Sequence, residues 1–243
     1  MGAVHADGIV SSDIVGYNTE SLTGGKLNVT GIMFVTPDGS DIDLNSGNVT
    51  IANLTAGADD TESDLILVWN PATSAYTTYY FYDEEGAEAE DVRWWDAGGE
   101  SEPVFPAGTA FWYKAKPGTG KSITVSGAIA SDATETFSIT GGKLNMCINP
   151  YPVDIDLNSS NVTIANLTAG ADDTESDLVL VWNPATSAYT TYYYYDEEGA
   201  EAEDVRWWDA GGESEPIITA GAGFWYKAKS GNGKSITFKS PIK

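Results

Sequence analysis

The sequence contains one long segment twice. Residues 41–125 align without gaps to residues 154–238, and the two copies differ at 11 of 85 positions. The flanking segments SLTGGKLN (21–28) and SITGGKLN (138–145) also match, although the stretch between flank and core is four residues longer in the first copy. Because each copy is long enough to bury its own core, the duplication predicts two domains of the same fold.

The duplication also gives the expected domain boundaries. We expect residues 1–19 to hold the remnant of a leader and an N-terminal strand, residues 20–130 to form repeat 1, and residues 131–243 to form repeat 2. The segment VHA at residues 4–6 has the small residues that end a secretory leader. This predicts a secreted protein of the extracellular space or the cell surface.

Strand signals fill each repeat. Residues 64–70 form a near-continuous apolar run, residues 70–74 (NPATS) have turn chemistry, and residues 76–82 are rich in Tyr and Thr. The two runs are expected to pair as a hairpin, with alternate side chains of residues 76–82 on opposite sheet faces. Further short strand candidates, separated by Gly, Pro and Asp, continue the pattern. The sequence therefore predicts an all-β chain of two tandem antiparallel β-sandwich domains, jelly-roll or Ig-like.

The chain is strongly acidic, with 36 acidic and 12 basic side chains and a formal net charge of −24. Each 85-residue core holds 15 acids and 4 bases, so the charge belongs mainly to the repeats. Such a field repels phosphate groups, and we therefore expect neither nucleic acid nor a membrane as a partner. The single cysteine, Cys147, lies in an apolar stretch that predicts a small buried side chain.

Three segments of the second repeat resemble a recurrent module of large secreted bacterial surface proteins. The resemblance covers roughly residues 138–240 and is carried by NPYP at 149–152, by LVLVWN at 178–183 with its Tyr-rich partner, and by GAGFW at 221–225. It implies an extracellular β-sandwich without an assigned catalytic activity, and it supplies no catalytic residues. Repeat 1 departs from the module because it lacks the NPYP segment.

The sequence contains no local catalytic motif, and we interpret the protein as a non-enzyme. The single histidine, His5, precedes both repeats, so no Ser or Cys of the repeats has a histidine base beside it in sequence. Six acids within residues 83–91 could supply the paired carboxylates of a glycosidase. A protonated catalytic acid needs an apolar pocket, however, so this dense acidic run favours a solvated loop.

The tryptophans offer a candidate ligand platform. Flat apolar rings beside polar groups are the combination that sugar sites use, and the candidate ligand-binding residues are Trp94, Trp112, Trp207 and Trp225. Trp112 and Trp225 are expected to be the better exposed, because alternation places each on a strand face that carries lysines. The competing interpretation places most aromatic rings in the core of a small sandwich.

A second candidate site is acidic. The segment ADDTESD at 58–64 and its copy at 171–177 place carboxylates at short alternating spacings, without the glycine of an EF-hand. The candidate calcium ligands are Asp59, Asp60, Asp64, Asp172, Asp173 and Asp177. We expect no required cofactor and keep a structural calcium ion as the alternative to a hydrated loop.

These features predict a non-catalytic tandem-repeat protein that acts as a structural or adhesive surface component. Free edges on the leading strand of repeat 1 (residues 8–17) and on the last strand of repeat 2 (residues 235–240) would allow strand addition or head-to-tail contact between copies, and hence a filament. The alternative function is a carbohydrate-binding module that contacts polysaccharide through exposed Trp and Tyr side chains.

Overall fold

The described part of the chain is all β. The computed structural model describes residues 15–88, 91–96, 99–100, 103–129, 134–201, 203–213 and 216–240. These residues form antiparallel sheets, with no helix and no closed barrel among them. They accordingly include no helix long and apolar enough to cross a membrane. The expected leader segment with His5, and residues 8–14 of the expected N-terminal strand (8–17), lie outside the described residues.

Repeat 1 contains three sheets. Its four-stranded sheet has β12 between β1 on one edge and β3 and β5 on the other, its six-stranded sheet has the order β2-β11-β6-β7-β8-β9, and β4 pairs with β10. The strands are β1 (Val15–Leu22), β2 (Leu27–Gly31), β3 (Phe34–Val35), β4 (Ile42–Asp43), β5 (Val49–Ala52), β6 (Leu65–Asn70), β7 (Ala75–Tyr82), β8 (Arg93–Asp96), β9 (Gly99–Glu100), β10 (Val104–Phe105), β11 (Ala110–Lys114) and β12 (Lys121–Ile129).

Repeat 2 has the same plan. Its sheets have the orders β13-β23-β16, β14-β22-β17-β18-β19-β20 and β15-β21, and none contains a strand of repeat 1. The strands are β13 (Thr134–Ile139), β14 (Leu144–Ile148), β15 (Ile155–Asp156), β16 (Val162–Ala165), β17 (Leu178–Asn183), β18 (Ala188–Tyr194), β19 (Trp207–Asp209), β20 (Gly212–Glu213), β21 (Ile217–Ile218), β22 (Gly223–Lys227) and β23 (Lys234–Lys239).

The predicted hairpin is confirmed. Strands β6 and β7 pair in antiparallel register from Leu65↔Tyr80 to Asn70↔Ala75. The Asn70 side chain closes the turn, because its Oδ1 accepts a hydrogen bond from the Ala72 backbone N at 2.9 Å. The predicted alternation also holds, since Tyr79 and Phe81 pack against the core of repeat 1. Tyr80 and its neighbours at even-numbered positions therefore lie on the outer face of the sheet.

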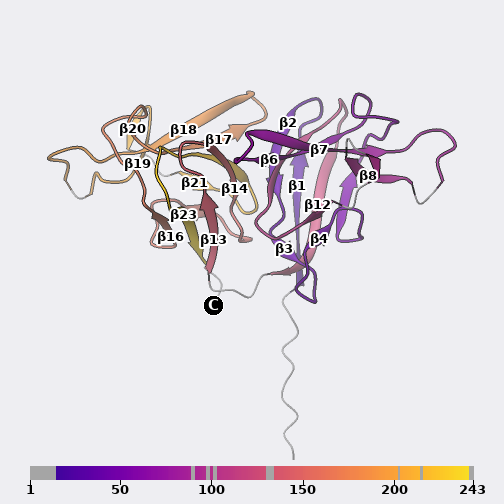
Figure 1. Ribbon diagram of the computed structural model, residues 1–243, viewed down its shortest axis with the longest axis horizontal. Coiled ribbons are helices and arrows are strands. Elements are labelled where there is room, and N and C mark those ends of the chain that lie inside the picture. The colour runs from indigo at the N-terminus through magenta and orange to yellow at the C-terminus, as the bar shows by residue number, and fades with distance from the viewer. Residues whose placement is uncertain are drawn as a thin grey trace, which may run out of the picture.

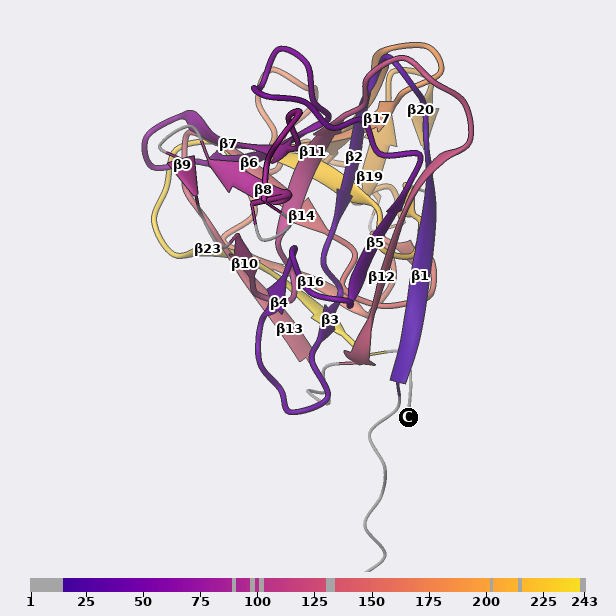
Figure 2. The ribbon, with the colours of Figure 1, turned by 90° about the vertical axis from the view of Figure 1, so that its right-hand side faces the viewer.

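Each repeat is a two-layer structure whose layers enclose one apolar core. Figure 2 views repeat 1 from its end, with the β1-β12-β5 layer beside the layer that contains β2, β11, β6, β7 and β8. Ile123 and Val125 from the first layer meet Ile66, Phe111 and Tyr113 from the second. Residues of repeat 2 form a separate core of the same kind. The all-β sandwich expected from the sequence is therefore observed.

The expected free edge at the end of repeat 2 is wrong. Strand β23 lies in the middle of its sheet, where it pairs with β13 along one side and with β16 along the other. Residues 134–139 thus pair with the edge of the last strand that was expected to be free. Among the described strands, β1 and β13 each pair with a single neighbour, β12 and β23 respectively. The leading strands β1 and β13 are therefore edge strands of these sheets, as are β5 and β16 at the opposite edges.

The two repeats contact each other through the outer faces of their six-stranded sheets (Figure 1). The Trp69 indole Nε1 donates a hydrogen bond to the carbonyl oxygen of Leu144 at 2.7 Å, and the Trp182 indole Nε1 donates to that of Leu27 at 2.7 Å. A lysine of each repeat likewise donates to a serine of the other, at 3.1 and 3.2 Å. Every one of these contacts occurs twice with the repeats exchanged, which is the signature of a pseudo-two-fold axis.

Candidate functional site

Two of the tryptophans proposed as ligand contacts are core residues. Trp94 and Trp207 occupy equivalent positions on β8 and β19 and are 2% and 1% exposed. In each repeat an aromatic ring of the neighbouring strand packs edge-on against the indole, Phe81 at 5.6 Å and Tyr194 at 5.5 Å between ring centroids. These two indoles therefore present almost no surface to a ligand.

The expected exposure of Trp112 and Trp225 is wrong. Both are 4% exposed, because they lie at the centre of the contact between the repeats with their ring centroids 6.3 Å apart. Trp182 packs edge-on against Trp112 at 5.4 Å, and Trp69 packs in the same way against Trp225 at 5.6 Å. The lysine that shares this strand face in repeat 1, Lys114, is exposed at the strand end, whereas the tryptophans are covered by the opposite repeat.

Two of the six proposed calcium ligands already have a cation. Asp64 and Asp177 are fully buried, and each accepts a hydrogen bond from a buried lysine ammonium at 2.8 Å, from Lys121 and Lys234 respectively. The same carboxylate of Asp64 also accepts from the Tyr113 hydroxyl at 2.8 Å and from two backbone N–H groups at 2.6 and 2.9 Å. Both oxygens of the carboxylate are therefore engaged, and the role of these two aspartates is structural.

Burial and the neighbouring aspartate raise the pKa of the tyrosine in each repeat. Burial, and then the negative charge of Asp64, raise the pKa of Tyr113 far above its ordinary value, and the equivalent groups act on Tyr226 in the same way. The ammonium of Lys121 is also saturated, since it donates to the Asn53 carbonyl oxygen at 2.7 Å and to the Thr55 hydroxyl at 2.9 Å. A buried pair whose donors and acceptors are all used avoids the cost of unpaired buried charge.

The other four proposed calcium ligands lie on exposed loops. Asp59 and Asp172 each cap a turn, accepting from the backbone N and the hydroxyl of the threonine two residues later at 2.8 and 2.7 Å. These hydrogen bonds, the hydroxyl first, hold the pKa of both aspartates below the ordinary range. Asp60 and Asp173 are exposed beside them. Within the described ranges, no group of three or more His, Cys, Asp or Glu side chains is arranged to hold a metal ion.

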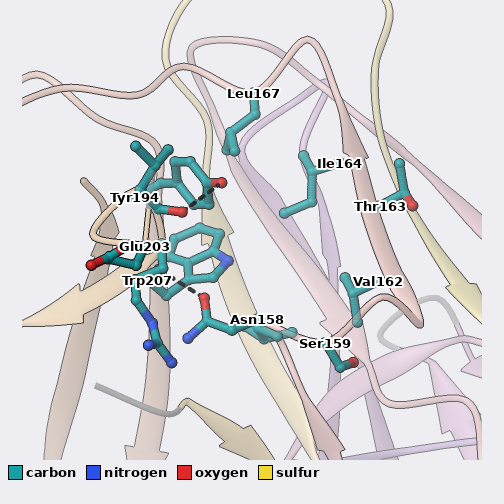
Figure 3. Close-up of a pocket in the computed structure, with 12 residues that line it drawn as sticks. Asn158, Ser159, Val162, Thr163, Ile164, Leu167, Tyr194, Glu203 and Trp207 are labelled. Atoms are coloured by element: carbon teal, nitrogen blue, oxygen red, sulfur yellow. Dashed lines mark hydrogen bonds between the residues drawn. The ribbon is translucent and has the colours of Figure 1, made fainter. Parts of the chain in front are cut away.

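A cleft between the layers of repeat 2 is a candidate site (Figure 3). Its volume is about 600 Å³, and it opens between β16 and the strands β18 and β19. Val162, Ile164 and Leu167 form one wall, and the rings of Tyr194 and Trp207 form the opposite wall. Polar side chains complete the lining, namely Asn158, Ser159, Thr163, Glu203 and Arg206.

Three hydrogen bonds to backbone groups hold the walls of the cleft together. Asn158 Oδ1 accepts a hydrogen bond from the Trp207 backbone N at 2.8 Å, which ties the β15–β16 turn to β19. The Tyr194 hydroxyl donates to the Val205 carbonyl oxygen at 3.3 Å, and the Tyr195 backbone N donates to the Arg206 carbonyl oxygen at 2.9 Å. The result is an apolar slot with a polar rim, a combination typical of small-ligand sites, which span roughly 300–1,000 Å³.

Repeat 1 has the same cleft in a smaller form. Its volume is about 210 Å³, and its described lining consists of aligned residues, with Phe81 in place of Tyr194 and without a counterpart of Thr163 or Glu203. The backbone N of Trp94 donates a hydrogen bond to Asn45 Oδ1 at 2.8 Å, as the backbone N of Trp207 does to Asn158 Oδ1. The sequence reasoning missed both clefts. The available signal was the single aromatic substitution at 81 and 194 within otherwise identical β7 and β18 segments.

The acidic run and the cysteine lie in different surroundings. Four of the described acids of the loop after β7 are exposed, as expected for a solvated loop, and Asp91 is partly buried; the exposed four are Asp83, Glu84, Glu85 and Glu88. Cys147 is buried, as expected, and burial raises its pKa to about 12, so the thiol stays protonated at neutral pH.

A scan against protein-family models, a search of curated proteins and a search of solved structures each give no match for this chain.

Proposed function

We propose that this chain is a non-catalytic structural or adhesive component of an extracellular surface, in which two β-sandwich repeats act as one body. The observation that carries the proposal is the reciprocal aromatic contact between the repeats. Its six aromatic side chains, three from each repeat, are Trp69, Tyr76, Trp112, Trp182, Tyr189 and Trp225. Trp112 and Trp225 are buried at the centre of this contact, whereas Tyr76 and Tyr189 at its margin are 43% and 41% exposed. Burial of the central indoles between the repeats stabilises a fixed arrangement of the two.

Shape complementarity supports a fixed arrangement. A Cβ atom at Gly223 of repeat 2 would lie 2.3 Å from Val29 Cγ1 of repeat 1, and one at Gly31 of repeat 1 would lie 2.6 Å from Ile148 Cδ1 of repeat 2. Each repeat therefore supplies a protruding aliphatic side chain and a glycine that makes room for one. Close packing of this kind resists sliding of one repeat on the other.

The edge strands support assembly between copies by strand addition. Strand β1 is eight residues long and pairs, among the described strands, only with β12, so one side of its backbone is available for a further strand. Tyr17 on β1 is 75% exposed, the largest exposed fraction among the large apolar residues of the described chain. Strand addition at such an edge in a non-closing arrangement produces filaments.

Electron microscopy of negatively stained protein tests the filament part of the proposal. We expect the wild-type chain to form filaments as its concentration rises, over a range of salt and calcium concentrations. Tyr17→Lys adds a charge to the edge strand and should suppress them, whereas Thr119→Lys adds the same charge on an exposed turn and should not. Monodisperse particles under every condition would remove the filament part.

An assay of hydrolysis tests the non-catalytic part. The chain is expected to release no nitrophenol from nitrophenyl glycosides above a sample that has been heated and cooled. Turnover that is lost when the exposed acids of the 83–88 segment are changed to their amides would contradict the proposal.

A further inference from the structure

The cleft of repeat 2 differs from its counterpart in ways that the shared sequence does not suggest. Its volume is almost three times as large, about 600 Å³ against about 210 Å³. The cleft of repeat 2 therefore has room that the cleft of repeat 1 lacks.

A serine at the same position of both clefts behaves differently. In repeat 1, Ser46 Oγ donates a hydrogen bond to the Asp43 carbonyl oxygen at 2.6 Å, so its hydroxyl is used within its own turn. In repeat 2, Ser159 Oγ is buried and has no hydrogen-bond partner among the described residues. A buried hydroxyl without a partner costs free energy. A ligand in the cleft that bonds this hydroxyl would recover that cost. The cleft of repeat 1 also contains a buried atom without a partner, Asn45 Nδ2, so its smaller volume is what excludes a ligand there.

A second hydroxyl is present only in repeat 2. Tyr194 replaces Phe81 on the aromatic wall, and its OH bonds the Val205 carbonyl oxygen at 3.3 Å. This bond anchors the segment before β19, and Phe81 cannot make it. The tyrosine ring remains partly exposed beside the slot, where it can pack against the apolar face of a ligand (Figure 3).

We propose that the cleft of repeat 2 binds one neutral sugar residue, and that the cleft of repeat 1 does not. The wall of Val162, Ile164 and Tyr194 suits the C–H face of a pyranose ring, and the Ser159 hydroxyl, once rotated about χ1 from its buried position toward the slot, suits its hydroxyl groups. The proposal is independent of the structural role of the repeats, because none of these residues lies in the contact between them.

Charge and polarity select this class of ligand over others. Glu203 and Arg206 lie in the same lining with opposite charges, so the rim favours neither an anion nor a cation. The net charge of −24 further disfavours an anionic ligand. An acyl chain would fill the apolar slot but would leave the Ser159 hydroxyl buried without a partner. An uncharged ligand with both an apolar face and hydroxyl groups avoids all three penalties.

Titration of the full chain with methyl glycosides tests the proposal. The probes are methyl β-glucopyranoside, methyl β-galactopyranoside and methyl α-mannopyranoside, followed by calorimetry and by amide NMR shifts. We expect at least one probe to bind once per chain, with a Kd on the order of 1 mM, as suits a small ligand with few contacts. The shifts should involve residues 157–167 and spare the equivalent residues 44–54.

Matched variants locate the site. Ser159→Ala should weaken binding about fivefold, the loss of one hydrogen bond, whereas Ser46→Ala should leave it unchanged. Tyr194→Phe should weaken it by a similar factor, because it removes the hydroxyl that is specific to repeat 2. Thermal unfolding of each variant shows whether the fold is kept. Binding of two sugars per chain, equal effects of the two serine variants, or binding of dodecanoate in place of every glycoside would overturn the proposal. Failure of all three glycosides to bind would do the same.

Discussion

The two repeats agree closely in their buried ion pairs and disagree in their clefts. In both, a lysine ammonium lies 2.8 Å from an aspartate oxygen and a tyrosine hydroxyl lies 2.8 Å from the same oxygen. The clefts are lined largely by aligned residues, yet one has almost three times the volume of the other and leaves its serine hydroxyl without a partner in the described structure. The buried ion pairs have the same geometry in both repeats because many short hydrogen bonds fix each group. The cleft linings have fewer such bonds, so their geometry differs between the repeats.

The ion pairs offer the strongest test of the equivalence. Asp64→Ala and Asp177→Ala each leave a buried lysine without its carboxylate, and each should lower the free energy of unfolding of its own repeat by about 3–5 kcal/mol. Denaturant titration followed by tryptophan fluorescence measures both losses. Because the two networks have the same partners, the losses should agree to within about 1 kcal/mol. A large effect in one repeat with little in the other would break the comparison.

The contact between the repeats is less symmetric than the ion pairs. The aligned positions Gly223 and Ala110 differ in how much room they leave for a side chain. Gly223→Ala introduces the residue that repeat 1 carries at Ala110, but its Cβ would meet Val29 Cγ1 at 2.3 Å. The crowding should cost about 2 kcal/mol, measured by denaturant titration, and adding Val29→Ala should recover much of it. The reverse change, Ala110→Gly, should cost only about 0.5–1 kcal/mol through chain entropy. Equal losses for Gly223→Ala and Ala110→Gly would show that the contact is symmetric after all.

The smallest expected effect is a pH dependence of the unfolding free energy. It arises at Glu20 of repeat 1 and is absent at the aligned position of repeat 2, which is Phe137. Burial, opposed by hydrogen bonds from Thr30 and Asn18, raises the pKa of Glu20 from 4.5 to about 7. The folded chain therefore keeps a proton that the unfolded chain has released, and stability falls as pH rises from about 4.5 to about 7.

Removal of the carboxylate should flatten this profile. Through Glu20, the wild type should lose about 1 kcal/mol of unfolding free energy between pH 4.5 and 7, after allowance for the partial exposure of the side chain. Glu20→Gln should abolish this loss. The measurement is the difference in unfolding free energy between wild type and variant at several pH values. Phe137→Leu, at the aligned position of repeat 2, should shift stability equally at every pH. Parallel profiles for wild type and Glu20→Gln would rule out this role.

Local sequence patterns predicted those structural features that depend only on residues close together in the chain. The hairpin of β6 and β7, and the placement of Tyr79 and Phe81 on the same face of their strand, followed from period and turn chemistry alone. The period did not indicate that this face meets the core. The burial of Cys147 followed from its apolar surroundings. Each of these outcomes is decided within a few residues of the position concerned.

Long-range packing limited the rest. Alternation placed Trp112 on the outer face of its strand but could not indicate that the second repeat covers this face. The aspartate spacing suggested a metal, whereas the cation that Asp64 binds is a lysine 57 residues further along the chain. Ser46 and Ser159 are aligned, but Gly47 follows the first and Ser160 follows the second, and this difference gave no expectation about the hydrogen bonding of the two serines.

The strand pairing within each repeat has a mechanical consequence. The first and last strands of repeat 1 are adjacent and antiparallel, with Val15 opposite Ala128, and in repeat 2 Thr134 lies opposite Lys239. Tension that enters at the start of the first strand and leaves at the end of the last thus pulls apart two neighbouring backbone ends. The load then breaks the ladder one pair after another, like a zipper, instead of shearing all pairs together. A module connected in this way yields at low force and lengthens gradually, which suits an extensible tether better than a stiff strut.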